Sequence, residues 1–207
     1  MSNLNLEYIH PQPIWWIDLD INLKNLQKMV YGFIKKLPNQ GNTNRGKLNY
    51  QSSNILNEQI TNNQFLLLLK QIKMYVRQAF DSYKPLSSTV DITNMWINVS
   101  NEGGYNEVHM HPGASIAGVY YVKVPNGDCG QIVFHRNSAE TYTIQSLGSA
   151  EDISTVEMPH THAHWTYPPK ENRLFIFPAW IPHSVRENNT KEDRISISFN
   201  FQRMSNK

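Results

Sequence analysis

The spacing of apolar residues changes at Pro85, and this change divides the chain into two regions of different secondary structure. Before Pro85, apolar residues recur every three or four positions across 22–37 and 62–83, which is the period of an amphipathic helix. Pro38 and Pro85 stand at or just beyond the ends of these two segments, where proline stops a helix. Residues 39–53 are rich in Asn, Gly and Ser and predict a loop. After Pro85 the apolar period becomes two, which is the period of a β-strand.

Six strands are expected in the second region, separated by breaks that contain glycine or proline: 90–100, 115–124, 131–134, 155–161, 173–178 and 194–203. Short strands at this spacing are typical of a sandwich or a small barrel. The predicted fold class is therefore mainly β with N-terminal helices, a jelly roll backed by a helical layer. We expect a single domain over 1–207, with the helical layer in 1–85 and the β core in 86–205.

Composition and charge narrow the class of protein. Hydrophobic residues make up 40% of the chain, which is enough for a packed core and argues against disorder. The formal net charge is +2 with Lys and Arg scattered, so nucleic-acid binding gains no support. The longest apolar run, 65–69, is too short to cross a bilayer, and we expect no membrane partner. Cys129 is the only cysteine, which excludes an internal disulfide and favours a reducing, cytoplasmic location.

The histidines are concentrated in a few places. His109 and His111 come just before an expected strand, and residues two apart in an extended segment share a face. Both imidazoles could therefore reach one metal ion. His183 lies far downstream at another strand end flanked by prolines, where a barrel could return it to the same mouth. The alternative is that His109 and His111 are only polar residues on a sheet face.

The last expected strand begins with Arg194 and alternates polar with apolar residues. Arg194, Ser196 and Ser198 share one face, opposite to an apolar face. A guanidinium fork beside a hydroxyl is suited to binding a carboxylate through two hydrogen bonds. A surface salt bridge is the alternative, and the nearby histidines favour the carboxylate.

Three blocks in this order carry a resemblance to a known family: WINVSNEGGYNEVHMHPGASIAGVYYVKVP, LFIFPAWIPHSVREN and DRISISFN. The sequence over 94–201 resembles the iron(II)- and 2-oxoglutarate-dependent oxygenases. More narrowly, it is similar to a bacterial and phage branch with an H-x-H-P block, then FP-x-W-x-x-H, then R-I-S-I-S-F-N. The fold implied by the resemblance is a double-stranded β-helix, a jelly roll whose open end holds the iron.

The resemblance also implies roles for single residues. His109 and His183 match iron ligands, and Arg194 matches the residue that binds the distal carboxylate of 2-oxoglutarate. Ser196 and Tyr121 match further 2-oxoglutarate-binding positions. His111 departs from the superfamily, whose second ligand is usually Asp or Glu, so the implied metal set is His109, His111 and His183. Glu107 is an alternative carboxylate ligand, two residues before His109.

The implied activity is that of a dioxygenase. Fe(II) is the metal, 2-oxoglutarate is the co-substrate, and O₂ is consumed while succinate and CO₂ are released. A C–H bond of an unknown small-molecule or peptidyl substrate is oxidised. The protein's own task is positioning and the exclusion of water.

Several other residues are weaker candidates. Arg136, His162 and His164 are expected at the rim, where they could face substrate; with His160, the last two could instead form a second metal face or supply the third iron ligand. Four tryptophans are expected in core or helix–barrel packing: Trp15, Trp16, Trp96 and Trp180.

Two other functions compete with the oxygenase. A cupin has the same jelly roll, and Gly103 followed by His109 and His111 matches the start of a cupin motif. However, the expected Glu after His111 is absent, and Arg194 has no role in a cupin. The other competitor is a binding protein that kept the barrel and lost the chemistry. A homodimer formed through the helical layer is also possible.

Overall fold

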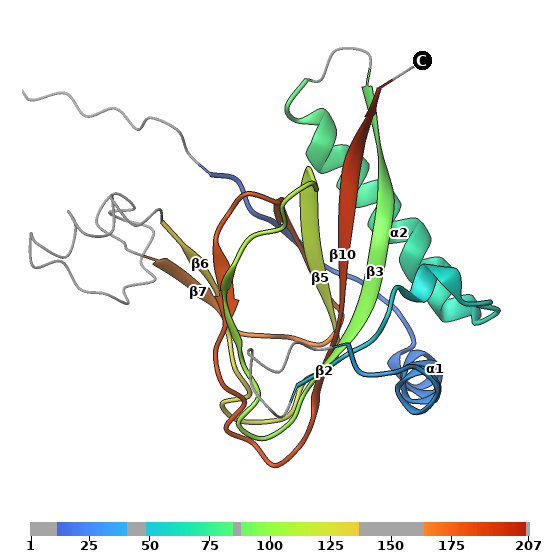
Figure 1. The fold of residues 1–207 in the computed structure, drawn as a ribbon, viewed down its shortest axis with the longest axis vertical. Helices are drawn as coiled ribbons and strands as arrows, with labels where there is room; N and C mark the ends of the chain where they lie inside the picture. Colours follow the sequence, from blue (N-terminus) through green and yellow to red (C-terminus); the bar gives the residue numbers. More distant parts are fainter. Residues whose placement is uncertain (1–11, 41–48, 85–87, 137–163, 206–207) are drawn as a thin grey trace, which may run out of the picture.

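Two antiparallel sheets face each other, and helices cover the outer side of the larger one (Figure 1). The structure, a computed structural model, describes residues 12–40, 49–84, 88–136 and 164–205. The larger sheet has the strand order β1 (Trp15–Asp18), β8 (Arg173–Pro178), β5 (Ile116–Lys123), β10 (Arg194–Ser205), β3 (Ser88–Ser100) and β2 (Asn49–Gln51). The smaller sheet has the order β4 (Asn106–His109), β9 (His183–Val185), β6 (Ile132–His135) and β7 (His164–Tyr167). The predicted fold class is confirmed.

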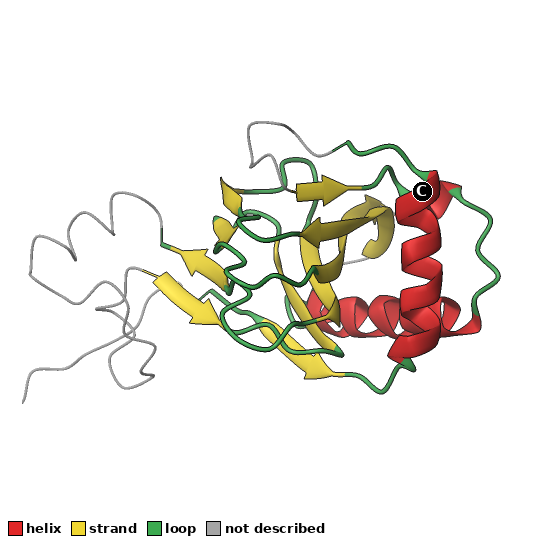
Figure 2. Cartoon of the chain, turned by 90° about the horizontal axis from the view of Figure 1, so that it is seen from below, coloured by secondary structure: helices red, strands yellow, loops and turns green. Residues whose placement is uncertain are grey.

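The helical layer consists of α1 (Leu23–Lys36) and α2 (Asn63–Asp81), with a short 3₁₀ turn η2 (Ile55–Asn57) between them (Figure 2). Each long helix begins after an asparagine whose side chain accepts hydrogen bonds from the backbone N–H groups of the first turn: Asn22 for α1 and Asn62 for α2. Both helices bury their apolar faces against the larger sheet. The two helices expected from the period are therefore confirmed.

The period of two places a hydrophobic core on each face of the larger sheet. On β3, Met95, Ile97 and Val99 pack toward the helices. The opposite face of the sheet, with Val119 and Phe177, packs against the smaller sheet around Phe134. The larger sheet is thus the shared wall of both cores, and its inner face is the one that faces the smaller sheet.

Gly118 on β5 is packed too tightly to accept a side chain. A Cβ atom at this position would lie 2.3 Å from Cζ of Phe199 and 2.5 Å from the carbonyl oxygen of Phe175. We expect Gly118→Ala to lower the free energy of unfolding by about 3 kcal/mol, because a packed core has no room for the extra methyl. Urea unfolding measures this, and Gly32→Ala is the control. Gly32 lies on α1 with nothing within 4 Å of a Cβ, so this variant should be neutral or more stable; equal stability of both variants would contradict the packing.

Five of the six expected strands are present, as β3, β5, β6, β8 and β10, and the sixth, 155–161, lies outside the described residues. The sequence did not predict β1, β2, β4, β7 or β9, which have only three or four residues. Such strands are too short to show a period and depend on their pairing partners. One of them, β2, lies inside the expected loop 39–53 and pairs with β3.

The expected packing of the tryptophans is only partly correct. Trp15 packs against the helical core, but Trp16 and Trp180 are 55% and 54% exposed. Trp16 carries the Arg173 guanidinium 4.4 Å above its ring, so a cation–π contact takes the place of burial. Trp96 lies on the inner face of β3, because the residues beside it, Met95 and Ile97, occupy the helical face.

Asn172, which precedes β8, ties the N-terminal region to the barrel. Its backbone has φ +65°, a conformation that asparagine tolerates better than other non-glycine residues. Its side chain accepts a hydrogen bond from the backbone N–H of Ile21, donates one to the Ile21 carbonyl, and accepts another from the Tyr120 hydroxyl.

No helix in the described ranges is long and apolar enough to cross a membrane.

A second contact between the N-terminal region and the barrel is the ion cluster at Asp18, with Lys170 and Arg173. Arg173 donates two hydrogen bonds to this carboxylate, of 2.7 and 3.0 Å, and Lys170 donates a third of 2.7 Å. These bonds hold the pKa of Asp18 well below its usual 3.8.

We expect Asp18→Asn to lower the free energy of unfolding by about 1 kcal/mol at pH 7, a modest value because the carboxylate is one-third exposed. Since the folded-state pKa is depressed, this contribution is complete above about pH 4 and disappears as the pH falls below it. Denaturant unfolding of both proteins between pH 7 and pH 2.5 checks this. Asp81→Asn, which breaks only the exposed helical pair with Arg77, should cost less. A difference for Asp18→Asn that persists at low pH would contradict the assignment.

Candidate active site

A cavity of about 250 Å³ lies between the two sheets. Its walls include all six residues expected to bind metal or co-substrate: His109, His111, Tyr121, His183, Arg194 and Ser196. These residues are distant in sequence, and the topology of the strands brings them together.

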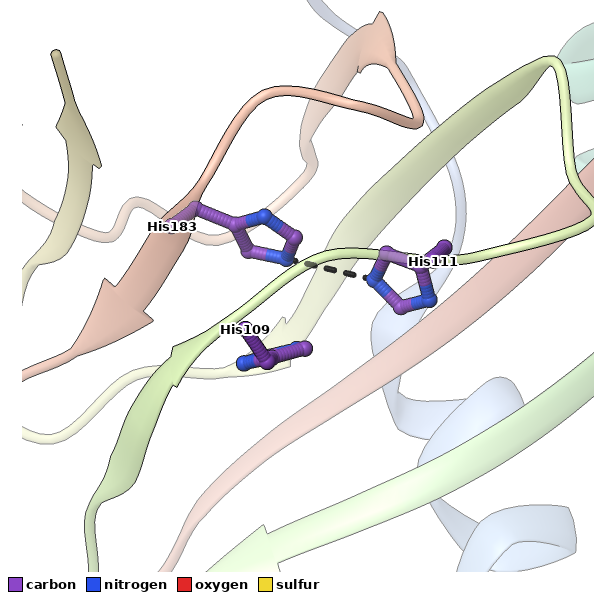
Figure 3. A group of neighbouring side chains, drawn as sticks. All are labelled: His109, His111 and His183. Carbon is purple, nitrogen blue, oxygen red and sulfur yellow. Dashed lines mark hydrogen bonds between the residues drawn. The ribbon is translucent and has the colours of Figure 1, made fainter. Parts of the chain in front are cut away.

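Pairing within the smaller sheet places the three histidines. His109 on β4 and His183 on β9 are direct register partners. His111 follows β4 in a turn that is fixed by a hydrogen bond of 3.0 Å from its backbone N–H to the carbonyl of Ala179, just after β8. One ring nitrogen of each histidine lies within 4.8 Å of the others, and the rings converge on one space (Figure 3).

Hydrogen bonds at the far side of two rings select the nitrogen that faces this space. His183 Nδ1 lies 2.9 Å from the carbonyl of Ile181, and His109 Nδ1 lies 2.8 Å from the carbonyl of Glu107. Because a carbonyl only accepts, each Nδ1 carries the proton, and Nε2 keeps the lone pair that a metal needs. Burial, with the His109 and His111 rings nearby, lowers the pKa of His183 to about 3, so its ring is neutral.

The spacing of the His111 and His183 nitrogens fits binding to one metal ion. His111 Nε2 and His183 Nε2 are 3.2 Å apart. Two imidazole nitrogens that bind one ion at about 2.0–2.1 Å are themselves separated by roughly 3 Å. The donor set is three neutral imidazoles, which suits iron, zinc, nickel or copper better than calcium or magnesium.

Arg194 lies at the start of β10 and is almost fully buried. Its Nη1 donates hydrogen bonds of 2.7 and 2.6 Å to the carbonyls of Cys129 and Gly130, and its Nη2 donates one of 2.6 Å to Ser100 Oγ. No carboxylate of the described residues pairs with it. These three bonds leave Nε–H and one Nη2 hydrogen of the five N–H donors, so the guanidinium is held in place and can still bind a carboxylate.

Tyr121 and Ser196 lie beside this guanidinium as register partners on β5 and β10. Burial raises the pKa of Tyr121 to about 12, although the Arg194 charge acts in the opposite direction. The phenol is therefore neutral and can donate a hydrogen bond. Arg194 also neighbours the Cys129 thiol, whose pKa is raised by burial.

The other candidates that lie in the described residues do not line the cavity. The exposed carboxylate of Glu107 is outside the histidine group, and the backbone carbonyl of Glu107 accepts the hydrogen bond from His109 Nδ1. The Arg136 guanidinium lies over the Trp165 ring, 5.1 Å from its centroid. His164 on β7 is the register partner of His135 on β6, and their ring centroids are 5.9 Å apart. Neither residue lines the cavity. His160 and His162 lie outside the described residues.

Sequence reasoning missed the contribution of β3 and β2. The cavity is also lined by Gln51, Asn94, Trp96, Asn98 and Ser100. The signal was available in β3, where Asn94, Trp96, Asn98 and Ser100 alternate with apolar residues. A strand with helices on one face and a cavity on the other shows this alternation.

Residues 94–200 match the model of a protein family described as "Putative 2OG-Fe(II) oxygenase", where 2OG is 2-oxoglutarate. The match spans just over half of the 207 residues and includes His109, His111, His183 and Arg194. The chain belongs to this family. A comparison with curated protein sequences gives no significant match.

Solved oxygenase structures have a similar fold. A prolyl hydroxylase from Trichoplax adhaerens, in complex with a hypoxia inducible factor peptide fragment, gives a TM-score of 0.63 at 13% identity, covering 91% of this chain and 83% of that chain. A prolyl-4-hydroxylase from Pseudomonas putida gives 0.59 at 12% identity, with 92% and 93% covered. HygX from Streptomyces hygroscopicus, with nickel, 2-oxoglutarate and hygromycin B bound, gives 0.58 at 8% identity, with 92% and 83% covered.

Membership of the 2-oxoglutarate/Fe(II) oxygenase family establishes the class of the protein. It is an enzyme, with Fe(II) as its metal and 2-oxoglutarate as its co-substrate. The oxygenase interpretation is therefore the one that the comparisons confirm, rather than the cupin. The jelly roll implied by the sequence blocks is the fold of this oxygenase.

Proposed function

We propose that this oxygenase oxidises a C–H bond of a small-molecule or peptidyl substrate, and that the cavity between the sheets is its active site. His109, His111 and His183 would hold Fe(II), while Arg194, Ser196 and Tyr121 would bind 2-oxoglutarate. One observation carries the proposal: the histidine group lines the same cavity as the buried Arg194, which pairs with no carboxylate of the described residues. The bound iron supplies the oxidising chemistry with O₂ and 2-oxoglutarate, and succinate and CO₂ are released.

The residues of the chain have separate tasks in this proposal. Arg194 binds the distal carboxylate of 2-oxoglutarate through its remaining N–H donors, and burial strengthens this pair by excluding water. Ser196 and the neutral phenol of Tyr121 add hydroxyl groups beside the guanidinium. Ser100 and the carbonyls of Cys129 and Gly130 keep the guanidinium in one orientation. This preorganisation lowers the entropy lost when the co-substrate binds.

Three imidazoles without a carboxylate give the metal site a higher positive charge than the two-histidine, one-carboxylate set of the wider superfamily. Glu107 does not restore the carboxylate in this structure, because its side chain is exposed outside the histidine group. His111 is therefore proposed as the third ligand.

The test is an anaerobic titration with Fe(II) followed by 2-oxoglutarate. We expect the weak visible charge-transfer band of chelated 2-oxoglutarate, and succinate formation when O₂ is admitted. Metal binding without the band would show that 2-oxoglutarate does not bind as proposed. Failure to bind metal would overturn the whole assignment.

Substrate type, assembly and location are supported less directly. The Trichoplax enzyme was solved with a peptide fragment and HygX with hygromycin B, so related folds take both peptides and small molecules. A homodimer through the helical layer and a cytoplasmic location stay predictions from the sequence.

A further inference from the structure

The inner face of the larger sheet has two chemically different halves. Toward β5 and β8 it is apolar, with Val119 and Phe177. Toward β3 and β2 it carries uncharged polar groups: Gln51, Asn94, Asn98, Ser198 and, from the facing sheet, Asn106. We call these five residues the amide wall. Trp96 lies on β3 between Asn94 and Asn98 of this wall, and its ring centroid is 5.9 Å from that of His111.

Strand register joins the amide wall to the proposed co-substrate residues. Gln51 is opposite Asn98, Asn98 is opposite Ser196, and Ser196 is opposite Tyr121. Opposite residues in an antiparallel sheet project their side chains on the same face. The row therefore runs from the co-substrate half of the cavity directly into the amide wall, beside the metal ligands.

The hydrogen-bonding capacity of the amide wall is largely unused by the described residues. Asn98 Nδ2 donates to Ser198 Oγ at 2.9 Å, and Asn94 Oδ1 accepts from Thr93 Oγ1 at 3.0 Å. Each of these amides keeps further N–H or carbonyl capacity, and the side chains of Gln51 and Asn106 bond no other described residue. Donors and acceptors are therefore presented together, the arrangement that matches hydroxyl and amide groups, which also donate and accept.

The charges around the cavity also favour an uncharged ligand. Among the described residues, the ionisable side chains that line the cavity are three histidines, Arg194 and Tyr121, and the proposed function assigns all of them to metal and 2-oxoglutarate. No described Asp, Glu or Lys lines the cavity. A charged group placed there would lose its water without gaining a counter-ion, which is unfavourable.

We infer that the amide wall is the substrate subsite, and that it takes an uncharged group bearing hydroxyls or amides next to the metal. This inference rests on the proposed function, because the reacting bond must lie beside the histidine group. Peptide amides and polyhydroxylated small molecules both provide such groups. Trp96 would pack against the C–H surface of either one.

The test compares matched fragments on protein loaded with Zn(II) and 2-oxoglutarate, which cannot turn over. Ligand-observed NMR measures the affinities of propionamide and 1,2-propanediol, which represent the amide and hydroxyl sources, against propionate and propylammonium. We expect at least one neutral fragment to bind tenfold more tightly than both charged ones. The neutral fragment that binds more tightly shows whether the substrate presents amide or hydroxyl groups to this subsite.

Variants place the binding in the amide wall. Asn94→Leu and Asn98→Leu should each weaken the neutral fragment at least fivefold, whereas Gln202→Leu, an exposed substitution elsewhere on β10, should not. Equal or tighter binding of a charged fragment, no binding of either neutral fragment, or full binding in both leucine variants would overturn the inference.

The same samples separate this inference from the proposed function. The NMR signals of 2-oxoglutarate report its own binding, which tests the function. If 2-oxoglutarate does not bind, the effect of the leucine variants on the neutral fragments still tests the subsite, because Asn94 and Asn98 have no assigned role in binding 2-oxoglutarate.

Discussion

Replacing His183 with alanine is expected to lower the affinity for Fe(II) or Zn(II) more than ~100-fold, since loss of a metal ligand exceeds the 10–100-fold effect of its hydrogen-bonding partners. His183 is the most buried of the three histidines, and its ring is already neutral and oriented by the carbonyl of Ile181. After its removal, two imidazoles remain, and both come from one short segment. Titration with Co(II), followed by visible absorption, measures the loss and reports the coordination geometry.

Controls separate loss of a ligand from loss of the fold. His183 packs against Phe177, with ring centroids 4.7 Å apart, so the thermal unfolding of the variant must be measured as well. His135→Ala removes a histidine of the same sheet that is outside the group and should keep full metal affinity. Glu107→Gln should also bind normally. Metal affinity within fivefold of wild type in folded His183→Ala would show that the histidine group is not the metal site.

Replacing Arg194 with alanine is expected to raise the Kd for 2-oxoglutarate by at least ~30-fold, because truncating one partner of a buried charge pair costs about 2–5 kcal/mol. The alanine variant also leaves the Cys129 and Gly130 carbonyls and Ser100 without their donor, which destabilises the fold. Arg194→Lys keeps a cation but loses the fork, so it should bind 2-oxoglutarate at least ~10-fold more weakly while remaining folded.

The readout for Arg194 is the Kd of 2-oxoglutarate in the presence of saturating Zn(II), with metal affinity measured separately. Metal affinity should be unchanged in Arg194→Lys, since Arg194 is not in the histidine group. Ser100→Ala loosens the guanidinium without removing it and should have an effect of only a few fold. An unchanged Kd in Arg194→Lys would assign the carboxylate to another residue.

The length of each element decided how much of the fold could be predicted. The helices α1 and α2 and the strands β3 and β10 have at least a dozen residues each, so their apolar period appears several times in the sequence. Strands β4 and β9 have four and three residues, and nothing local distinguishes them from loops. They exist because they pair with each other and with β6, which sequence reasoning does not show.

Prediction of the candidate site needed both local sequence patterns and the tertiary arrangement of the strands. The two-residue spacing of His109 and His111 is local, and it led to the expectation that both could reach one metal ion; both line the cavity. That His183 joins them is a tertiary fact, which the sequence suggested through its Pro-flanked strand end in an expected barrel and through the family resemblance. The amide wall was missed although the polar residues alternate with apolar ones along β3, because this alternation does not show that the opposite sheet encloses the polar face.

The order of the strands has a consequence for synthesis of the chain. Of the described strands, β10 is made last, yet it lies between β5 and β3 in the larger sheet. A nascent chain that ends before Arg194 can pair β1, β8 and β5 on one side and β3 with β2 on the other, with two unpaired edges between them. Such edges recruit strands from other chains and promote aggregation. Entry of β10 closes both edges and delivers Arg194 and Ser196 to the cavity in the same event, so protection from aggregation and assembly of the pocket are one step of folding.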